Sequence, residues 1–118
     1  MSKYRKDNVF NKILHNEIPY DFVAENEFAL AFRDIDPKAN VHVLVIPKGE
    51  FSTFYDFHST ANSMQIVGFY SLINEVISSM KLVQTGFKLV SRAGSNGGQE
   101  VLHFHVHILG GENVADMP

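Results

Sequence analysis

The run HFHVH at residues 103–107 constrains the fold more than any other part of the chain. Successive side chains of a β-strand point to opposite faces of a sheet. In a strand, His103, His105 and His107 therefore share one face, while the phenylalanine and valine between them join the apolar face. We predict a strand over residues 101–109 whose three imidazoles project the same way, so that two or three rings can converge on one small anionic group.

The rest of the hydrophobic pattern predicts an α+β fold built on a mostly antiparallel sheet of about five strands, with one long and one short helix laid against it. The stretch 51–57 fits either a turn or a short helical piece. The expected strands, besides the one above, cover residues 20–25, 28–33, 41–46 and 87–92.

Both expected helices are amphipathic. The short helix is expected to begin at a cap formed by Asp7 or Asn8. The long helix is expected to begin at Ser59 or Thr60 and to end near Leu82. Its buried stripe is predicted to consist of Ile66, Phe69, Tyr70, Ile73, Ile77 and Met80.

The composition is that of one globular domain, residues 1–118, with 45% hydrophobic and 19% charged residues. A net charge of −3 argues against a nucleic-acid polymer as partner, because proteins that bind one need a basic surface. The absence of cysteine excludes disulfides and thiolate metal ligands. A polar N-terminus and short apolar stretches predict neither a signal peptide nor a membrane span, so we expect no membrane association and a cytoplasmic location.

Three interpretations of the histidine row are open from the residues alone. The row can be a solvated polar face with no function. It can be a metal site, because neutral imidazoles are good zinc ligands, although no cysteine or acidic residue lies in the row. It can also support phosphoryl transfer, in which one imidazole attacks phosphorus and its neighbours hydrogen-bond the non-bridging oxygens.

A glycine-rich segment, residues 93–99, directly precedes the predicted histidine strand. Such a segment is typical of a tight turn between strands. Its backbone N–H groups could also bind phosphate oxygens. Its position beside the histidines favours the phosphate interpretation.

These residues resemble the histidine triad family. Its signature is three histidines separated by single apolar residues and followed by two further apolar residues. Residues 103–109 match that signature at every place. Similarity extends over about residues 9–111 and includes FRDIDP at 32–37, VHVLVIPK at 41–48 and the Gly-Gly pair at 110–111. The resemblance implies the family's fold, with the sheet extended across a homodimer and the long helix near the interface.

The resemblance also implies roles for individual residues. His105 would be the nucleophile that becomes nucleotidylated, His107 would bind phosphate oxygens, His103 would orient the site, and His42 would support the triad. Asp34 would accept hydrogen bonds from the ribose hydroxyls. The purine would be held by five apolar residues: Val9, Phe10, Ile13, Phe32 and Ile35. The phosphate would be bound by Gln99 and by the backbone near Val101.

Arg92 departs from the family pattern, which has asparagine there, and could add positive charge near the phosphate. The Gly-Gly pair after the triad resembles the nucleoside phosphoramidase branch. We therefore expect hydrolysis of the P–N bond in purine nucleoside phosphoramidates through a nucleotidyl-histidine, with no metal and no cofactor. The alternatives are a dinucleoside polyphosphate hydrolase and a nucleotide-binding regulatory module whose hydrolysis is incidental.

Overall fold

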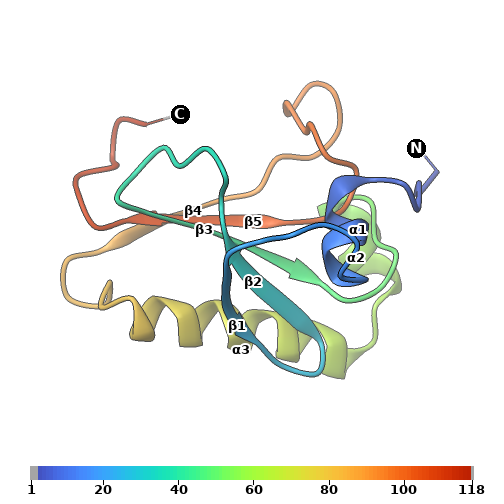
Figure 1. Cartoon of the computed structure of the whole chain (residues 1–118), viewed down its shortest axis with the longest axis horizontal. Helices are drawn as coiled ribbons and strands as arrows, with labels where there is room; N and C mark the ends of the chain where they lie inside the picture. Colours follow the sequence, from blue (N-terminus) through green and yellow to red (C-terminus); the bar gives the residue numbers. More distant parts are fainter. Residues whose placement is uncertain (1–2, 118) are drawn as a thin grey trace.

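The computed structural model describes residues 3–117 and folds them into one antiparallel sheet with helices on both faces (Figure 1). The strand order is β1-β2-β3-β5-β4, and each neighbouring pair is antiparallel. The elements are α1 (Val9–Leu14), β1 (Phe22–Glu25), β2 (Ala29–Arg33), β3 (Val41–Pro47), α2 (Phe54–Thr60), α3 (Ser63–Ser79), β4 (Phe87–Val90) and β5 (Val106–Gly110). The predicted α+β class and the five antiparallel strands are confirmed.

The helix caps confirm the sequence prediction for α1 and correct it for α3. Asn8 caps α1, because its side chain accepts a hydrogen bond from the backbone N–H of Asn11 at 2.9 Å. The predicted cap of the long helix at Ser59 or Thr60 is wrong, since both residues belong to the additional helix α2.

The backbone becomes extended at Ala61, directly after α2, and the N-cap of α3 is Asn62. Asn62 and Gln65 form a capping box in which each side chain bonds the other residue's backbone N–H at 2.8 Å. The helix ends at Ser79, three residues before the expected Leu82. Both corrections make the helix shorter than predicted.

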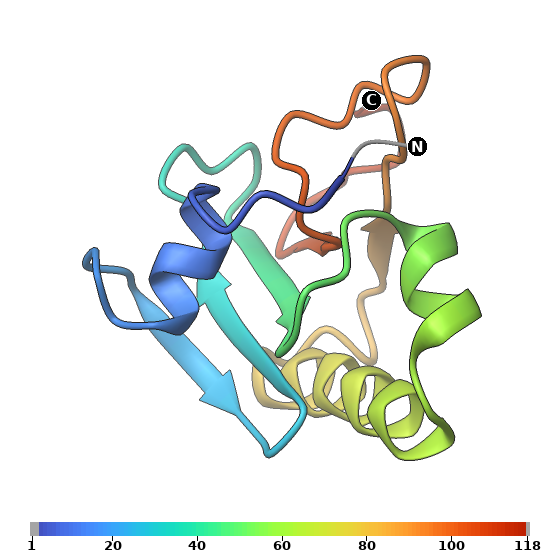
Figure 2. The ribbon, with the colours of Figure 1, turned by 90° about the vertical axis from the view of Figure 1, so that its right-hand side faces the viewer.

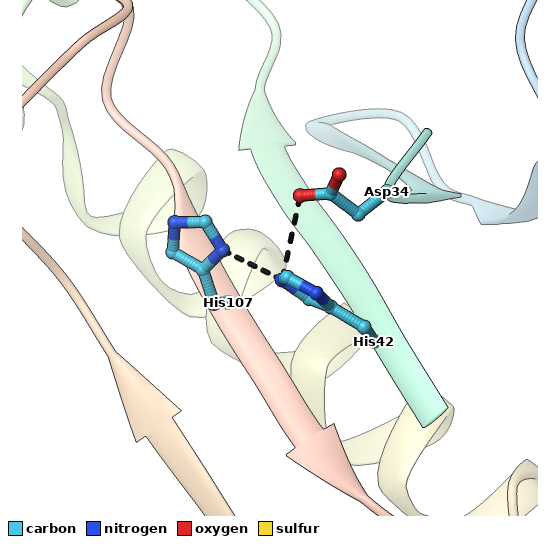
Figure 3. Close-up of side chains that lie close together, drawn as sticks. All are labelled: Asp34, His42 and His107. Carbon is cyan, nitrogen blue, oxygen red and sulfur yellow. Dashed lines mark hydrogen bonds and ion pairs between the residues drawn. The ribbon is translucent and has the colours of Figure 1, made fainter. Parts of the chain in front are cut away.

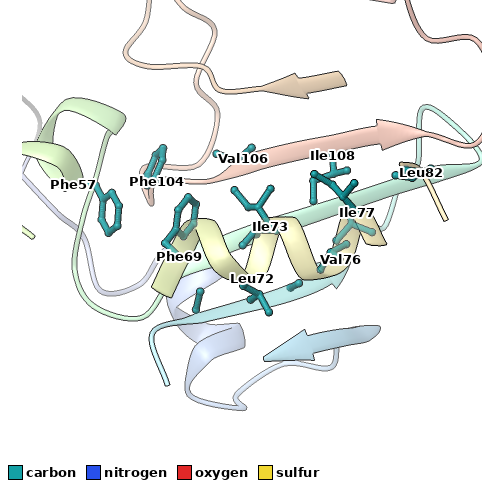
Figure 4. Close-up of a cluster of buried hydrophobic side chains, with 14 residues drawn as sticks. Phe57, Phe69, Leu72, Ile73, Val76, Ile77, Leu82, Phe104, Val106 and Ile108 are labelled. Carbon is teal, nitrogen blue, oxygen red and sulfur yellow. The ribbon is translucent and has the colours of Figure 1, made fainter. Parts of the chain in front are cut away.

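Helix α3 covers one face of the sheet and forms the main core with it (Figures 1 and 4). Its fully buried side chains on this face include Phe69, Leu72 and Val76, which meet the sheet at helical spacing. The predicted stripe placed Tyr70 in this face, but Tyr70 is 38% exposed. Its hydroxyl instead bonds His58 of α2 at 2.8 Å.

The opposite face of the sheet carries α1 and a smaller apolar cluster (Figure 2). Strand β3 supplies both cores, as its continuous apolar sequence predicted: Val43 and Val45 pack toward α3, while Leu44 and Ile46 pack toward α1. His42 has the same parity as Leu44 and therefore lies on the α1 face. Among the described residues, no helix combines the length and apolarity needed to cross a membrane.

Candidate active site

The histidine run only partly forms a strand. β5 begins at Val106, so His103 and His105 lie in the segment before it, and the strand predicted over 101–109 is too long. The backbone N–H of Phe104 donates to the carbonyl of Phe51 at 2.8 Å, and the pairing of β5 with β3 ends at Val106 opposite Val45. The apolar side of the alternation holds nevertheless, because Phe104 and Val106 both pack in the core beneath α3 (Figure 4).

A cavity of about 1420 Å³ opens on the α1 face of the sheet. It is bounded by α1, by the sheet strands β2 to β5 and by the loops that follow β2 and β4. All predicted site residues but His103 line it: Val9, Phe10, Ile13, Phe32, Asp34, Ile35, His42, Arg92, Gln99, Val101, His105 and His107. The structure therefore brings together side chains that lie as far apart in the sequence as α1 and β5.

His103 does not line the cavity, so of the two or three rings expected to converge on one group, His105 and His107 do so. The His103 side chain is 0% exposed and lies between two partners. Nε2 is 2.9 Å from the carbonyl oxygen of Pro47, which can only accept, so Nε2 carries the proton. Nδ1 then accepts from the phenol of Tyr4 at 2.7 Å. Burial lowers the pKa of His103 to about 4, so the ring is neutral at pH 7.

A backbone carbonyl also fixes the tautomer of His105, but here the protonated nitrogen is Nδ1 and not Nε2. Its Nδ1 lies 2.7 Å from the backbone carbonyl of His103 and must donate to it. In the neutral ring, Nε2 therefore keeps a free lone pair. Burial lowers the pKa of His105, and the edge-on ring of Phe10, 4.9 Å away between centroids, fixes the imidazole from the side. His105 is thus a neutral, oriented imidazole at the cavity wall.

His42, Asp34 and His107 form a second connected group (Figure 3). The backbone N–H of Lys38 donates to Nδ1 of His42 at 3.0 Å, so the proton of this ring is on Nε2. That N–H lies 2.9 Å from Nδ1 of His107 and 3.4 Å from a carboxylate oxygen of Asp34. Since Nδ1 of His107 accepts, its Nε2–H is a donor.

The pKa values of this group also favour neutral rings. Burial, together with the neighbouring His105 and His42, lowers the pKa of His107 to about 4. Burial lowers the pKa of His42 as well, and the carboxylate of Asp34 only partly opposes it. At neutral pH the site therefore offers one imidazole lone pair, on His105, beside one imidazole N–H donor, on His107.

Ligand atoms of Asp34, His42 and His107 lie within 4.8 Å of one another, the spacing of a metal site. The positions of the protons on these side chains do not suit a metal ion. Nε2 of His42 would have to give up its proton to bind a cation, and Nδ1 cannot take that proton because it faces the Lys38 N–H. The donor chemistry here therefore fits a hydrogen-bond relay rather than a metal centre.

The glycine-rich segment is a turn that uses several of its own N–H groups. The N–H groups of Gly98 and Gln99 donate to carbonyls of Ser95 and Gly94, both at 3.1 Å. The Gln99 side chain accepts from Gly94 N–H at 3.0 Å and donates to the carbonyls of Ser52 and Val101 at 2.7 and 2.9 Å. Gln99 thus ties the glycine-rich loop to residues 52 and 101 at the edge of the cavity.

Exposed groups form the rim of the cavity. Ile35 lines it with a fully exposed side chain, so it can contact a ligand without belonging to the core. Arg92 and Glu100 place opposite charges at its edge. The Arg92 charge is near enough to contribute to the lowered pKa of His107.

Sequence reasoning missed four contributors to the site. Tyr4 carried no signal, because it is a single aromatic residue in a polar stretch. The amide of Lys38 carried none either, since a backbone group leaves no trace in side-chain patterns. Leu44 and Leu109 also line the cavity, and they could have been found because they share strand parity with His42 and His107.

Comparisons with known proteins agree on one family. The model of the HIT domain matches residues 15–114. The chain is 40% identical to an uncharacterized HIT-like protein of Rickettsia prowazekii, covering 94% of this chain and 92% of that one. It is 34% identical to the purine nucleoside phosphoramidase of Escherichia coli K12, covering 95% and 93%.

Among solved structures, the crystal structure of a HIT family hydrolase from Legionella pneumophila superimposes with a TM-score of 0.86 at 37% identity. The match covers 95% of this chain and 99% of that one. The fold, the histidine run and these similarities lead to one conclusion: the chain belongs to the HIT-domain family.

Proposed function

We propose that the protein hydrolyses the P–N bond of purine nucleoside phosphoramidates through a covalent nucleotidyl-histidine. The observation that carries this proposal is the proton arrangement of the cavity wall. His105 is neutral and has its lone pair on Nε2, because Nδ1–H is committed to the carbonyl of His103. The purine nucleoside phosphoramidase of E. coli, a relative at 34% identity, supports this choice of substrate.

The reaction has two steps. Nε2 of His105 forms a bond to phosphorus while the P–N bond breaks, and the leaving amine takes up a proton. Water then attacks the same phosphorus, which releases the nucleoside monophosphate and frees His105. Net, the hydroxyl of one water ends on phosphorus and its remaining proton on the amine. The Nε2–H of His107 hydrogen-bonds a non-bridging oxygen, whose charge must be held in both transition states.

The nucleoside end of the substrate fits the other side of the cavity. The carboxylate of Asp34 is partly exposed and lies at the end of β2, where it can accept hydrogen bonds from both ribose hydroxyls. One of its oxygens already accepts the N–H of Asp36 at 2.8 Å, which fixes the carboxylate. The purine would rest on Phe10 and Phe32, two rings in edge-to-face contact at 5.6 Å.

The decisive experiment compares turnover of adenosine 5′-phosphoramidate with that of a diadenosine polyphosphate. We expect the phosphoramidate to be the better substrate by kcat/KM. The variant His105→Asn should lose turnover by about a thousandfold or more, because the nucleophile is gone. His15→Asn is the matched control, since this exposed histidine at the end of α1 lies outside the cavity.

Two results would contradict the proposal. A clear preference for the polyphosphate would make the protein a dinucleoside polyphosphate hydrolase. Tight nucleotide binding with no turnover by the wild-type protein would make it a binding module. Rapid-quench mass spectrometry adds a direct check, because a nucleotidyl adduct should form on wild-type protein and be absent from His105→Asn.

We also propose that the protein forms a homodimer by joining sheets. Within residues 3–117, β4 is an outer strand of the sheet and pairs on one side only, with β5. Its side chains Phe87 and Leu89 are 42% and 44% exposed, and Val83, just after α3, is also exposed. An unprotected apolar edge strand of this kind favours pairing with a second copy.

A further inference from the structure

The N-terminal segment before α1 is fixed against the site, although it precedes residues 15–114 that match the HIT domain. The Asn11 side chain donates to the carbonyl of Lys6 at 2.9 Å, and the Asn8 side chain donates to the carbonyl of Arg5 at 2.6 Å. The Lys6 ammonium lies 3.7 Å from a carboxylate oxygen of Glu50. These contacts bring the half-buried Tyr4 onto His103.

Hydrogen bonds link Tyr4 to the predicted nucleophile through the ring and the backbone of His103. The phenol O–H donates to Nδ1 of His103 at 2.7 Å, and Nε2–H of the same ring donates to the carbonyl of Pro47 at 2.9 Å. The backbone carbonyl of His103 then accepts Nδ1–H of His105 at 2.7 Å. Both ring nitrogens of His103 are thus occupied, and its backbone carries the group that sets the proton position on His105.

We propose that Tyr4 is a positioning residue, which locks His103 through its phenol and thereby holds the carbonyl that keeps the lone pair of His105 on Nε2. The effect on catalysis rests on the proposed function, whereas the positioning of His103 does not.

The burial of His103 explains why the phenol is needed. His103 is 0% exposed with Tyr4 in place, so the Tyr4 phenol, and not water, supplies the donor to Nδ1 in the folded protein. The Tyr4 and His103 rings also meet edge to face, with centroids 5.6 Å apart. The hydrogen bond and the ring packing can therefore be separated by substitution, since Tyr4→Phe removes only the first and Tyr4→Ala removes both.

The control exploits a second tyrosine–histidine pair. Tyr70 bonds Nε2 of His58 at 2.8 Å on the other side of the sheet, away from the cavity. Tyr70→Phe removes a phenol from an imidazole in the same way and should leave turnover unchanged. Any effect specific to Tyr4→Phe then belongs to His103 and not to the loss of a phenol in general.

The first measurement needs no substrate. Imidazole 15N–1H correlation spectra of the full-length protein report which nitrogen of each ring is protonated. In Tyr4→Phe, the Nδ1 signal of His103 should shift and the Nδ1–H signal of His105 should broaden or move, while His58 stays unchanged. Unchanged His103 and His105 signals in Tyr4→Phe would overturn the proposal, whether or not the protein cleaves phosphoramidates.

The second measurement is kinetic. With adenosine 5′-phosphoramidate, Tyr4→Phe should lower kcat by about tenfold, the worth of one hydrogen bond, with KM within twofold of wild type. A merely structural role would move KM or thermal stability instead. Equal kcat in Tyr4→Phe and wild type, with loss only in Tyr4→Ala, would mean that ring packing matters and the hydrogen bond does not.

Discussion

The buried His103 predicts a specific acid sensitivity of the fold. Its usual pKa of 6.5 falls to about 4 in the folded protein, because burial penalises the charged ring. The unfolded chain therefore takes up a proton here more readily than the folded one. The stability that His103 contributes is complete above pH 6.5 and declines as the pH falls toward 4.

The size of this effect follows from the two pKa values. Between pH 7 and pH 5, a histidine whose pKa changes from 6.5 to about 4 on folding lowers the free energy of unfolding by ~2 kcal/mol. The variant His103→Gln removes the titrating group but keeps its hydrogen bonds, since an amide can donate to the carbonyl of Pro47 and accept from Tyr4.

Urea denaturation of the wild-type protein and of His103→Gln, each at pH 7 and pH 5, measures the effect. The quantity compared is the loss of unfolding free energy between the two pH values in each protein. The wild-type protein should lose ~2 kcal/mol more unfolding free energy between these pH values than His103→Gln does. The other depressed histidines are present in both proteins, so their contributions cancel. Equal losses within 0.5 kcal/mol would show that His103 is accessible to protons in the folded state, and the account of its burial would be refuted.

Three further perturbations test the fold and the assembly. Leu72→Ala should cost about 2–5 kcal/mol in urea denaturation because it empties a fully buried site beneath the sheet, whereas Val67→Ala, at an exposed site on the same helix, should change stability by less than about 0.5 kcal/mol. Asn62→Ala should cost about 1 kcal/mol by removing the capping box of α3, and no loss would mean that the helix does not depend on this cap. Leu89→Lys should convert a dimer to a monomer in sedimentation velocity, and an unchanged mass would place the interface elsewhere.

The sequence predicted which face each side chain takes better than it predicted where elements end. Alternation placed Phe104 and Val106 in the core and His107 on the opposite face, and all three lie there. The start of β5 could not be predicted, because a residue just before it bonds a remote segment: the N–H of Phe104 donates to the carbonyl of Phe51, whose ring packs on Phe57 of α2. Strand parity is local, whereas strand ends are decided by tertiary contacts.

The residues of the site were predictable from the histidine motif and from the resemblance to the histidine triad family. His105, His107 and Asp34 were named from the sequence, and all three line one cavity. The environment of His103 was not predictable, because both of its partners are remote: Tyr4 is 99 residues away and the Pro47 carbonyl is 56. A row of like residues suggests like roles, and only the packing shows that one ring supports the others from behind.

The orientation of the imidazoles has a consequence for how such a site can change over generations. His105, His103 and His42 each take their proton position from a main-chain group: the carbonyls of residues 103 and 47 and the N–H of residue 38. A point mutation at position 38 or 47 replaces a side chain but retains the peptide group, unless proline enters at 38. The other side chains around the cavity can therefore vary while the lone pair of His105 stays on Nε2. In this sense the tautomers of the three rings are insulated from mutational drift, whereas the other side chains of the cavity wall are not.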